Sequence, residues 1–359
     1  MGLDFSVEPT PTPTSPERLA EIFAAPGFGQ TFTDHMVSVR WTPASGWHQA
    51  RVHPYGPLQV DPATHIFHYG QSIFEGFKAY LQPDGSIATF RPETNGRRFQ
   101  HSAERLALPT LEVDDFVAAA DALIRQDAAW VPTGPDDSLY IRPFMVATEV
   151  GLGVRPASDV TFMVIASPAG AYFAKGSKRV AIWLSEDYTR AAPGGTGAAK
   201  CGGNYAASLV AQQEAIANGC EQVLFLDAVE RRWVEELGGM NLWLVLDNGT
   251  VVTPELTGTI LDGVTRDTIK TLAAEDGRVV KERRVDIDEW RKGVDEGAIT
   301  EVFACGTAAV ITSVGTLRWH DGEVSMPAET PVADALRTTM VDLQHGRIPD
   351  PHGWMHTVR

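Results

Sequence analysis

Residues 191–208, AAPGGTGAAKCGGNYAAS, form the stretch that most constrains the structure of this chain. Lys200 is its only charged residue, and most of the residues around it are glycine or alanine. Glycine lets a backbone approach a bulky group closely, and a lysine without a nearby carboxylate, in a partly dry pocket, loses part of its preference for the charged form. Such an amine attacks carbonyl groups, which favours a Schiff-base lysine that binds an aldehyde cofactor. The alternative is a flexible glycine-rich loop, and this stretch alone slightly favours that alternative, because such loops are common at turns.

The composition is that of a globular protein without a polyanionic partner. A chain of 359 residues can form two domains with a sizeable core, and 43% hydrophobic and 21% charged residues are ordinary values. A net charge of −16 argues against a surface for nucleic acid or an anionic membrane. Three widely spaced cysteines, Cys201, Cys220 and Cys305, predict no disulfide framework and a reducing compartment. With no predicted signal peptide and no apolar run of roughly 18 residues, we expect a cytoplasmic protein.

The first half of the chain predicts a domain that mixes strands and helices. Residues 1–16 are rich in Pro and Thr and are expected to be disordered or loosely draped, before a short helix over 17–25. Pro83-Asp84-Gly85 predicts the turn of a hairpin between residues 77–80 and 87–91, and Pro92 begins a helix. Further strands are expected over 32–41, 64–69, 138–149 and 160–167, and a second helix over 111–130.

Residues 168–177, PAGAYFAKGS, are the best candidate for a domain boundary, because they are rich in glycine and alanine and separate two strand-rich halves. After them we expect a helix over 205–218 that Gly219 ends. The other expected elements are strands over 179–185, 221–227, 281–285 and 301–304, a hairpin over 234–254 that turns at 247–249, a loop and helix over 256–277, and helices over 286–296 and 330–344. The predicted domains are a tail with a short helix at 1–30, a small N-terminal domain at 31–167, an interdomain loop at 168–178 and a large cofactor-binding domain at 179–359.

Two loops could bind the anion of an aldehyde cofactor. Gly263-Val264-Thr265 stands where a loop becomes a helix, so free N–H groups and the helix dipole point to one place. Taken alone, the pattern is explained more simply by an ordinary helix cap from Thr265 or Asp262. The same reasoning applies to Gly306-Thr307-Ala308, which directly follows the strand TEVFA. Arg98 could add a positive charge, or it could lie on a solvated helix face with the arginines near it.

A carboxylate in the segment VEELGGMN could keep the ring nitrogen of a cofactor protonated. Glu235 and Glu236 point to opposite faces of the expected strand, so we expect one to be buried and the other to be solvated. The alternative places both at the surface. Five residues form an aromatic and basic set. Without further information they are interpreted as residues of the core or of its rim: Tyr69, Phe74, Tyr140, Arg142 and Tyr205. Metalloprotease, hydrolase, P-loop and dinucleotide motifs are absent, and no metal site is predicted.

A series of motifs follows in order along almost the whole chain from about Thr31. They are HYGQSIFEGFKAY (68–80), FRPETNGRRFQHSAERL (90–106), LYIRP (139–143), GLGV (151–154), KCGGNYAASLVAQQEAIANGCEQVLFLD (200–227), EELGGMN (235–241), LTGTILDGVTRDTI (256–269) and EVFACGTAAV (301–310). The series resembles the branched-chain amino acid aminotransferases, a class IV aminotransferase family that uses pyridoxal phosphate. FEG-x-KAY, K-x-GGNY and GCEQVL together distinguish this family from the related D-amino acid aminotransferases and aminodeoxychorismate lyases.

The resemblance implies the two-domain fold of type IV among pyridoxal-phosphate enzymes, in the α+β or α/β class. A smaller N-terminal α/β domain would precede a larger C-terminal domain, which is built on a mixed, barrel-like sheet with surrounding helices. The linker near residues 169–178 would be a mobile loop over the active site. The family is dimeric, with the site at the subunit interface, so we expect a homodimer.

The resemblance also implies cofactor-binding residues, position by position. Lys200 is similar to the Schiff-base (aldimine) lysine and to the base that moves the 1,3-proton. Glu236 would pair with the pyridine nitrogen, and Tyr205 would donate a hydrogen bond to the phenolic oxygen. The other cofactor residues would hold the phosphate or pack on the ring: Arg98, Gly239, Met240, Leu261, Gly263, Val264, Thr265, Gly306 and Thr307.

Substrate-binding residues follow from the same resemblance. The N–H groups of Thr307 and Ala308, with Tyr69, would bind the α-carboxylate of the substrate. Phe74, Tyr140 and, from the neighbouring subunit, Val154 would form the side-chain pocket. Arg142 would bind the distal carboxylate of glutamate, which explains how an apolar pocket also accepts an acidic substrate.

The sequence departs from the family pattern at a few positions. Ala309 and Thr312 stand where mammalian members have a Cys-x-x-Cys redox pair, so no thiol switch of that kind is expected. Gly239 replaces a threonine of some relatives, so one hydroxyl contact near the phosphate is not expected here.

The predicted function is that of a pyridoxal-phosphate-dependent branched-chain-amino-acid transaminase. It would transfer the amino group reversibly between L-leucine, L-isoleucine or L-valine and 2-oxoglutarate by a ping-pong route. Two alternatives remain at this point: a D-amino acid aminotransferase or lyase of the same fold, and a cofactor-free binding protein on a decayed enzyme scaffold. The sequence leaves open which branched-chain substrate is preferred and in which direction the enzyme works.

Overall fold

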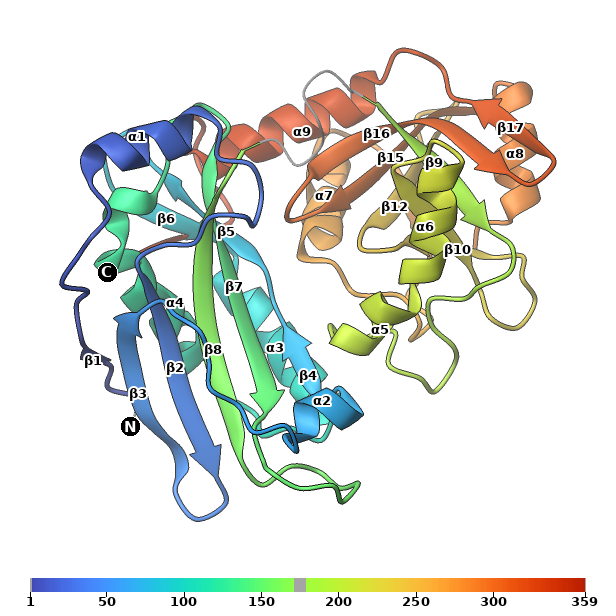
Figure 1. Ribbon diagram of the computed structural model, residues 1–359. Coiled ribbons are helices and arrows are strands. Elements are labelled where there is room, and N and C mark those ends of the chain that lie inside the picture. Colours follow the sequence, from blue (N-terminus) through green and yellow to red (C-terminus); the bar gives the residue numbers. More distant parts are fainter. Residues whose placement is uncertain (1, 171–178, 359) are drawn as a thin grey trace. The chain divides into compact units, whose positions relative to one another are not determined.

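The computed structural model describes residues 2–170 and 179–358, and its contacts divide the chain into two compact units (Figure 1). Unit 1 comprises Met1–Tyr172, Ala199–Gly202 and Asp342–Arg359, and unit 2 comprises Phe173–Ala198 and Gly203–Val341. The short segment around Lys200 therefore belongs to unit 1, although the chain on both sides of it belongs to unit 2.

A nine-stranded sheet forms the centre of unit 1. Its strands are β1 (Ser6–Val7), β2 (His35–Thr42), β3 (Gly46–Pro54), β4 (Ser72–Phe74), β5 (Phe77–Leu81), β6 (Ile87–Phe90), β7 (Ser138–Ala147), β8 (Val160–Ala169) and β18 (Met355–Thr357). Their order is β1-β3-β2-β8-β7-β5-β6-β18, and β4 pairs with β7. The β1–β3 pair is parallel, whereas the long pairs such as β7–β8 and β2–β8 are antiparallel.

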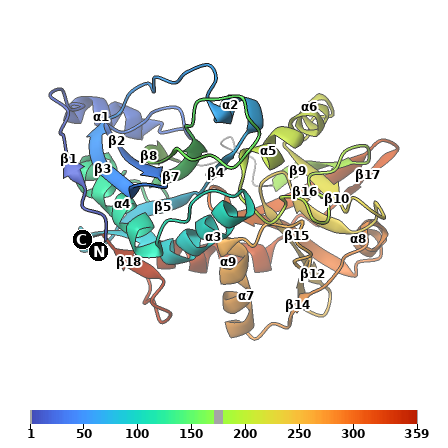
Figure 2. The same ribbon diagram turned by 90° about the horizontal axis from the view of Figure 1, so that it is seen from below.

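The helices of unit 1 are α1 (Pro16–Ala24), α2 (His65–Tyr69), α3 (Pro92–Arg105) and α4 (Val113–Gln126), followed by a 3₁₀ turn over Ala128–Trp130. Figure 2 shows α3 and α4 along one face of the sheet. Their apolar residues recur at helical spacing, so each helix buries one stripe against the strands. The rings of Phe99 and Phe116 lie 5.2 Å apart, and Phe99 lies 5.5 Å from Phe162 of β8. This aromatic cluster fixes α3, the helix that carries Arg98.

Unit 2 contains a second nine-stranded sheet, which is mixed. Its strands are β9 (Arg179–Ser185), β10 (Gln222–Leu226), β11 (Val234–Leu237), β12 (Asn241–Leu246), β13 (Val251–Thr253), β14 (Val280–Glu282), β15 (Ile299–Gly306), β16 (Val310–Trp319) and β17 (Gly322–Ser325). The order is β11-β10-β9-β16-β15-β12-β13-β14, and β17 pairs with β16. β9 is parallel to β10 and β16, whereas β12 is antiparallel to β13 and β15.

Helices pack around the second sheet. They are α5 (Gly202–Ala207), α6 (Leu209–Ala217), α7 (Val264–Glu275), α8 (Ile287–Asp295) and α9 (Pro331–Gln344). Ala211 and Ala215 bring α6 against Trp183 and Phe225 of the sheet. Trp290 of α8 is fully buried among the apolar residues of β12 and β15. The sheet with its helices agrees with the mixed, barrel-like sheet that the resemblance implied.

Most of the predicted elements of the first half are present, but the segment 64–69 was predicted wrongly. It forms helix α2 rather than a strand, and it ends at Gly70 in the left-handed conformation, with φ 59°. A segment as short as HIFHY fits the hydrophobic period of a helix and that of a strand. The glycine after it, which is typical of a helix end, was the signal that separates the two. The tail up to Pro16 is draped rather than disordered, because β1 pairs with β3 and Thr14 hydrogen-bonds to Asp34.

In the second half, the helix expected over 205–218 is divided into α5 and α6, and Gly219 ends α6 with φ 68° as predicted. β16, β17 and β18 were not predicted. The predicted domain limits stay a prediction, and contacts group residues 342–359 with unit 1, because β18 pairs with β6. Of the expected interdomain loop 168–178, Pro168 and Ala169 lie in β8, and 171–178 lie outside the described residues.

Candidate active site

The predicted site residues divide between the two units. Unit 1 contains Tyr69, Phe74, Arg98, Tyr140, Arg142, Val154 and Lys200. Unit 2 contains Tyr205, Glu236, Gly239, Met240, Leu261, Gly263, Val264, Thr265, Gly306, Thr307 and Ala308. Each set is positioned by the strands and helices of its own unit.

The backbone of Lys200 is fixed by hydrogen bonds to two elements of unit 1. Its N–H donates to Ser102 Oγ of α3 at 2.9 Å, and its carbonyl accepts the N–H of Phe74 of β4 at 3.0 Å. The next residue, Cys201, forms an isolated bridge with Ile73. The side chain is half-buried, with Nζ 4.9 Å from the centre of the Phe74 ring. The alternative of a flexible loop is therefore wrong for Lys200, whose main chain is tied to β4 and α3.

The small residues before Lys200 allow close backbone approach inside unit 2. A Cβ on Gly197 would lie 2.4 Å from the carbonyl oxygen of Thr259, so only glycine fits this position. The Asn204 side chain donates to Thr196 O at 2.8 Å and accepts from Thr196 Oγ1 at 2.7 Å. These contacts close the glycine-rich segment into a defined loop.

Arg98 forms a buried, two-pronged ion pair with Glu75. Nε lies 2.7 Å from Oε1 and Nη2 lies 2.9 Å from Oε2, and Asn95 donates to Oε2 at 2.8 Å. Burial raises the pKa of the Glu75 carboxyl, but the charge and hydrogen bonds of Arg98, the charge of Lys200 and the amide of Asn95 together lower the pKa below its ordinary value. Arg98 therefore lies in a neutralised, buried pair, and the alternative of a solvated helix face is wrong.

Replacing Glu75 with glutamine is expected to lower the free energy of unfolding by about 3–5 kcal/mol at neutral pH, because it removes the carboxylate that neutralises buried Arg98. Because folding lowers the pKa of Glu75, its contribution is present above the ordinary pKa and is lost as the pH falls through the folded-state value. The stability difference between the wild type and the variant should therefore shrink in acid, which urea unfolding at several pH values measures. Glu104→Gln, an exposed change on α3, is the control. A difference that stays constant down to strong acid would contradict the assignment.

Phe74, Tyr140 and Arg142 form an aromatic and cationic cluster in unit 1. The Arg142 guanidinium lies 4.8 Å from the Phe74 ring centre and 5.3 Å from that of Tyr140, and it donates to Tyr140 Oη at 3.2 Å. A Cβ on Gly76 would lie 1.9 Å from Tyr140 Oη, so glycine at this position makes room for the tyrosine. The structure thus brings together Lys200 and three of the predicted substrate residues, because the Lys200 amine also lies over Phe74.

The remaining two unit 1 residues lie near a protruding loop. Tyr69 is 37% exposed, and its hydroxyl donates to the carbonyl of Leu152 at 2.5 Å. Val154 is 84% exposed, and its neighbours Val150 and Leu152 are also largely exposed. Val154 therefore does not join the cluster around Phe74 within the described chain.

Glu236 of β11 is buried in unit 2, beside a second buried charge. The Arg190 guanidinium forms an ion pair with Glu236 Oε1, and both side chains are 4% exposed. Leu261 N–H also donates to Oε1, at 2.9 Å, and Asn241 Nδ2 donates to the carbonyl of Leu261 at 2.9 Å. Glu236 and Leu261, both predicted as cofactor residues, are thus joined directly.

Glu235, the other member of the pair, is buried as well, at 5% exposed, so the expectation that one of the two glutamates is solvated is wrong. They do point to different partners, as strand alternation requires. Glu235 accepts a hydrogen bond from the hydroxyl of Thr259, because the segment after β13 folds over this side of β11. Sequence alone could not reveal that cover.

Helix α7 begins after Gly263, an N-cap residue that has no side chain to cap the first N–H groups. Gly263 is its N-cap residue with no side-chain hydrogen bond, so the predicted alternative of a cap from Thr265 or Asp262 is wrong. A Cβ on Gly263 would lie 2.0 Å from Asn241 Oδ1, so a larger residue here would displace the Asn241 side chain. Val264 and Thr265 of the first turn are both buried. A helix start of this kind suits an anion.

Of the other predicted residues of unit 2, Tyr205 lies in α5, and the rest lie at the turns around 239–240 and 306–308. Gly306 ends β15, and Thr307 and Ala308 form the half-buried turn before β16. A Cβ on Gly306 would lie 3.4 Å from Met240 Cγ, and one on Gly239 would lie 3.6 Å from the Tyr205 ring. Gly239 and Tyr205 are therefore neighbours, as are Gly306 and Met240.

Comparisons with known proteins identify the family. The sequence model of the family described as "Amino-transferase class IV" matches residues 72–317. A protein of Streptomyces coelicolor named "Probable branched-chain-amino-acid aminotransferase" is 58% identical over 355 residues, which cover 98% of this chain and 98% of that protein. The chain belongs to the class IV aminotransferases. This membership confirms the predicted family and the predicted reaction class.

The fold of this class IV aminotransferase is similar to that of solved structures. The branched-chain amino acid aminotransferase of Escherichia coli is 30% identical with a TM-score of 0.74, over 90% of this chain and 100% of that one. A second branched-chain amino acid aminotransferase, from T.th. and solved with pyridoxamine 5'-phosphate, is 29% identical with a TM-score of 0.73, over 90% of this chain and 99% of that one. The predicted two-domain fold of type IV is confirmed.

Several residues that organise this class IV aminotransferase were missed in the sequence. They are the partners of predicted residues: Glu75 of Arg98, Arg190 of Glu236, Asn241 of Gly263 and Ser102 of Lys200. Glu75 had a usable signal, because a carboxylate between Phe74 and Gly76 in an apolar segment needs a cationic partner. Arg190 had no signal beyond its place just before the glycine-rich stretch.

Three further observations concern metal binding, membrane-spanning helices and the cysteines of this enzyme. Within residues 2–170 and 179–358, no group of three or more His, Cys, Asp or Glu side chains could hold a metal ion. Of the helices in the described part of the chain, none has the length and apolar character that crossing a membrane requires. Cys201, Cys220 and Cys305 are free and buried, and burial raises the pKa of Cys220 and raises that of Cys305 to about 12.

Proposed function

We propose that the chain is a branched-chain-amino-acid transaminase with pyridoxal 5'-phosphate as its cofactor. It transfers the amino group reversibly between L-leucine, L-isoleucine or L-valine and 2-oxoglutarate. The observation that carries the proposal is Lys200, whose main chain is tied to β4 and α3 and whose amine lies over Phe74. The names of the close relatives support the substrate class.

The residues present suit the cofactor. The start of α7, whose N-cap residue is Gly263, would offer N–H groups from Val264 and Thr265 to a phosphate, and Thr307 would add a further donor. Glu236, a buried carboxylate that forms an ion pair with Arg190, would accept a hydrogen bond from the protonated pyridine nitrogen. Tyr205 would donate to the phenolic oxygen, and Leu261 would pack on the ring. Arg98 would add positive charge for the phosphate, although Glu75 neutralises most of that charge.

When bound, pyridoxal phosphate supplies a carbonyl carbon for amines and a ring that accepts an electron pair. Lys200 would hold this carbon through its Nζ in the resting enzyme and release it to the substrate amine. The freed Lys200 amine would take the proton from the substrate α-carbon. Its amine lies 4.9 Å from the centre of the Phe74 ring.

Substrate recognition would use both polar and apolar residues. The N–H groups of Thr307 and Ala308, with the Tyr69 hydroxyl, would bind the α-carboxylate. Phe74 and Tyr140 would contact a branched side chain. Arg142, which packs on both rings, would bind the distal carboxylate of glutamate.

We further propose that the enzyme is a homodimer of the cytoplasm. Val150, Leu152 and Val154 of one loop are 58%, 68% and 84% exposed, and such apolar exposure suits burial against a second copy, where Val154 would help to form the partner's substrate pocket. The free, buried thiols suit a reducing compartment. Sedimentation equilibrium of the wild type and of Val154→Asp measures whether this loop holds a dimer together.

A visible absorbance spectrum before and after addition of L-leucine, without a 2-oxo acid, tests the proposed function. We expect a coloured protein whose cofactor band disappears while the band of the amine form grows. D-Alanine, added in parallel, should leave the spectrum unchanged. A colourless protein would support the cofactor-free binding protein, and a response to D-alanine alone would support the D-amino acid aminotransferase.

A further inference from the structure

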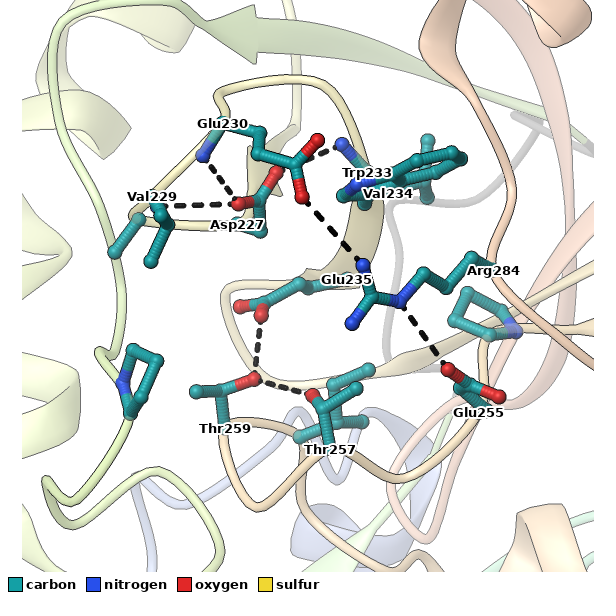
Figure 3. Close-up of a pocket in the computed structure, with 14 residues that line it drawn as sticks. Asp227, Val229, Glu230, Trp233, Val234, Glu235, Glu255, Thr257, Thr259 and Arg284 are labelled. Atoms are coloured by element: carbon teal, nitrogen blue, oxygen red, sulfur yellow. Dashed lines mark hydrogen bonds and ion pairs between the residues drawn. The ribbon is translucent and has the colours of Figure 1, made fainter.

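A pocket of about 210 Å³ lies in unit 2 on the Glu235 side of β11 (Figure 3). Part of its wall is apolar and comes from three separate segments: Pro193, Val229, Val234, Pro254 and Ile260. Pockets that hold drug-sized ligands measure roughly 300–1,000 Å³, so this smaller pocket suits a molecule of about amino-acid size.

Glu235 gives the pocket an unusual polar feature. Its side chain lies among the lining residues in Figure 3, with Oε1 bonded to the hydroxyl of Thr259, which lies 2.7 Å from Thr257 Oγ1. Its other oxygen, Oε2, is buried and has no hydrogen-bond partner within the described part of the chain. Buried polar atoms normally have partners, so an oxygen of this kind marks a position where a ligand donor fits.

The other charged residues of the lining are already paired. Asp227 accepts the N–H groups of Glu230 and Trp233. Arg284 lies 3.5 Å from Glu230 and 3.3 Å from Glu255, so its charge is matched by those two carboxylates. Glu235 is therefore the lining carboxylate that has a buried oxygen without a hydrogen-bond partner in the described part of the chain. A cationic donor would complete its hydrogen bonding.

We propose that this pocket is a second ligand site, which takes a small apolar molecule that carries an ammonium group. The apolar body lies against Val229, Pro254 and Ile260, and the ammonium N–H donates to Glu235 Oε2. Burial raises the pKa of Glu235, and a bound cation would stabilise its ionised form, which strengthens the interaction. The site is separate from the contacts of Glu236, because the two side chains leave β11 in opposite directions.

Calorimetric titration of the holoenzyme with N,N-dimethyl-3-methylbutylamine tests this proposal. Its tertiary ammonium group has one N–H donor but cannot form a Schiff base with an aldehyde, so it does not react at the Lys200 site. We expect saturable binding to the wild type and binding at least ~10-fold weaker to Glu235→Gln, since hydrogen bonds to charged groups contribute this much. The neutral ketone 4-methyl-2-pentanone has a hydrogen-bond acceptor but no donor. Its binding should not be weaker to Glu235→Gln than to the wild type.

Val229→Trp is the second variant, because Val229 is 74% exposed at the edge of the pocket and a large ring there covers the opening without disturbing the core. It should abolish binding of the amine while transaminase activity stays unchanged. Absence of binding to the wild type at millimolar amine would overturn the proposal. Equal affinity of the wild type and both variants would overturn it as well, because the amine would then bind elsewhere.

Discussion

Replacing Lys200 with alanine is expected to lower kcat by ~10⁴-fold or more and to remove the absorbance of the covalently bound cofactor. The substitution removes the amine that binds the cofactor carbon and moves the proton. It leaves the backbone contacts of residue 200 with Ser102 and Phe74 intact, so the unfolding temperature should change little. Steady-state kinetics with L-leucine and 2-oxoglutarate, together with the visible spectrum, measure both effects.

Lys292→Ala provides the control for this change. Its ammonium group pairs with Asp288 on the surface of α8, and the side chain is 71% exposed. This variant should keep kcat and the spectrum of the wild type. Retention of either property by Lys200→Ala would remove the basis of the proposed mechanism.

Replacing Glu236 with glutamine is expected to lower kcat by roughly 10²–10³-fold, because charge stabilisation of the cofactor ring nitrogen is lost. The amide can still accept the N–H of Leu261, so the loop at 259–263 should stay in place. The same change removes the negative charge beside Arg190, which is buried, and should lower the free energy of unfolding by about 3–5 kcal/mol. Kinetics and urea unfolding measure the two losses separately.

Two further variants separate the catalytic effect of Glu236 from its effect on stability. The double variant Arg190→Met, Glu236→Gln removes both buried charges, so it should recover part of the stability while kcat stays low. Glu235→Gln changes the adjacent, equally buried glutamate on the other face of β11 and should keep kcat near the wild-type value. A comparable loss of kcat in Glu235→Gln would contradict the assignment of Glu236.

Local signals in the sequence predicted the elements that have sharp boundaries. Pro83-Asp84-Gly85 turns the β5–β6 hairpin, Pro92 begins α3 and Gly219 ends α6, each as expected from the backbone preferences of these residues. The hydrophobic pattern of residues 64–69 does not distinguish a helix from a strand, and the segment was wrongly predicted as a strand. β18 was missed because its stability comes from pairing with β6, which is far away in the sequence.

The candidate site shows the same division between local and distant information. The motifs contain Lys200, Arg98 and Glu236, and the resemblance assigned a role to each. Their partners are distant: Arg98 and Glu75 are 23 residues apart, and Glu236 and Arg190 are 46 residues apart. Pattern reasoning within one segment cannot pair residues at such separations. The burial of Glu235 was also missed, because a different segment covers it.

The three buried thiols have a practical consequence for anyone who handles this enzyme. Because Cys201, Cys220 and Cys305 are shielded by packing, alkylating reagents reach them only after the surrounding structure has opened. The rate of modification at each sulfur would then report how often its own neighbourhood opens. Cys201 follows Lys200 directly in unit 1, and Cys305 precedes the Gly306 turn in unit 2. Modification of these native cysteines therefore measures local opening in both units.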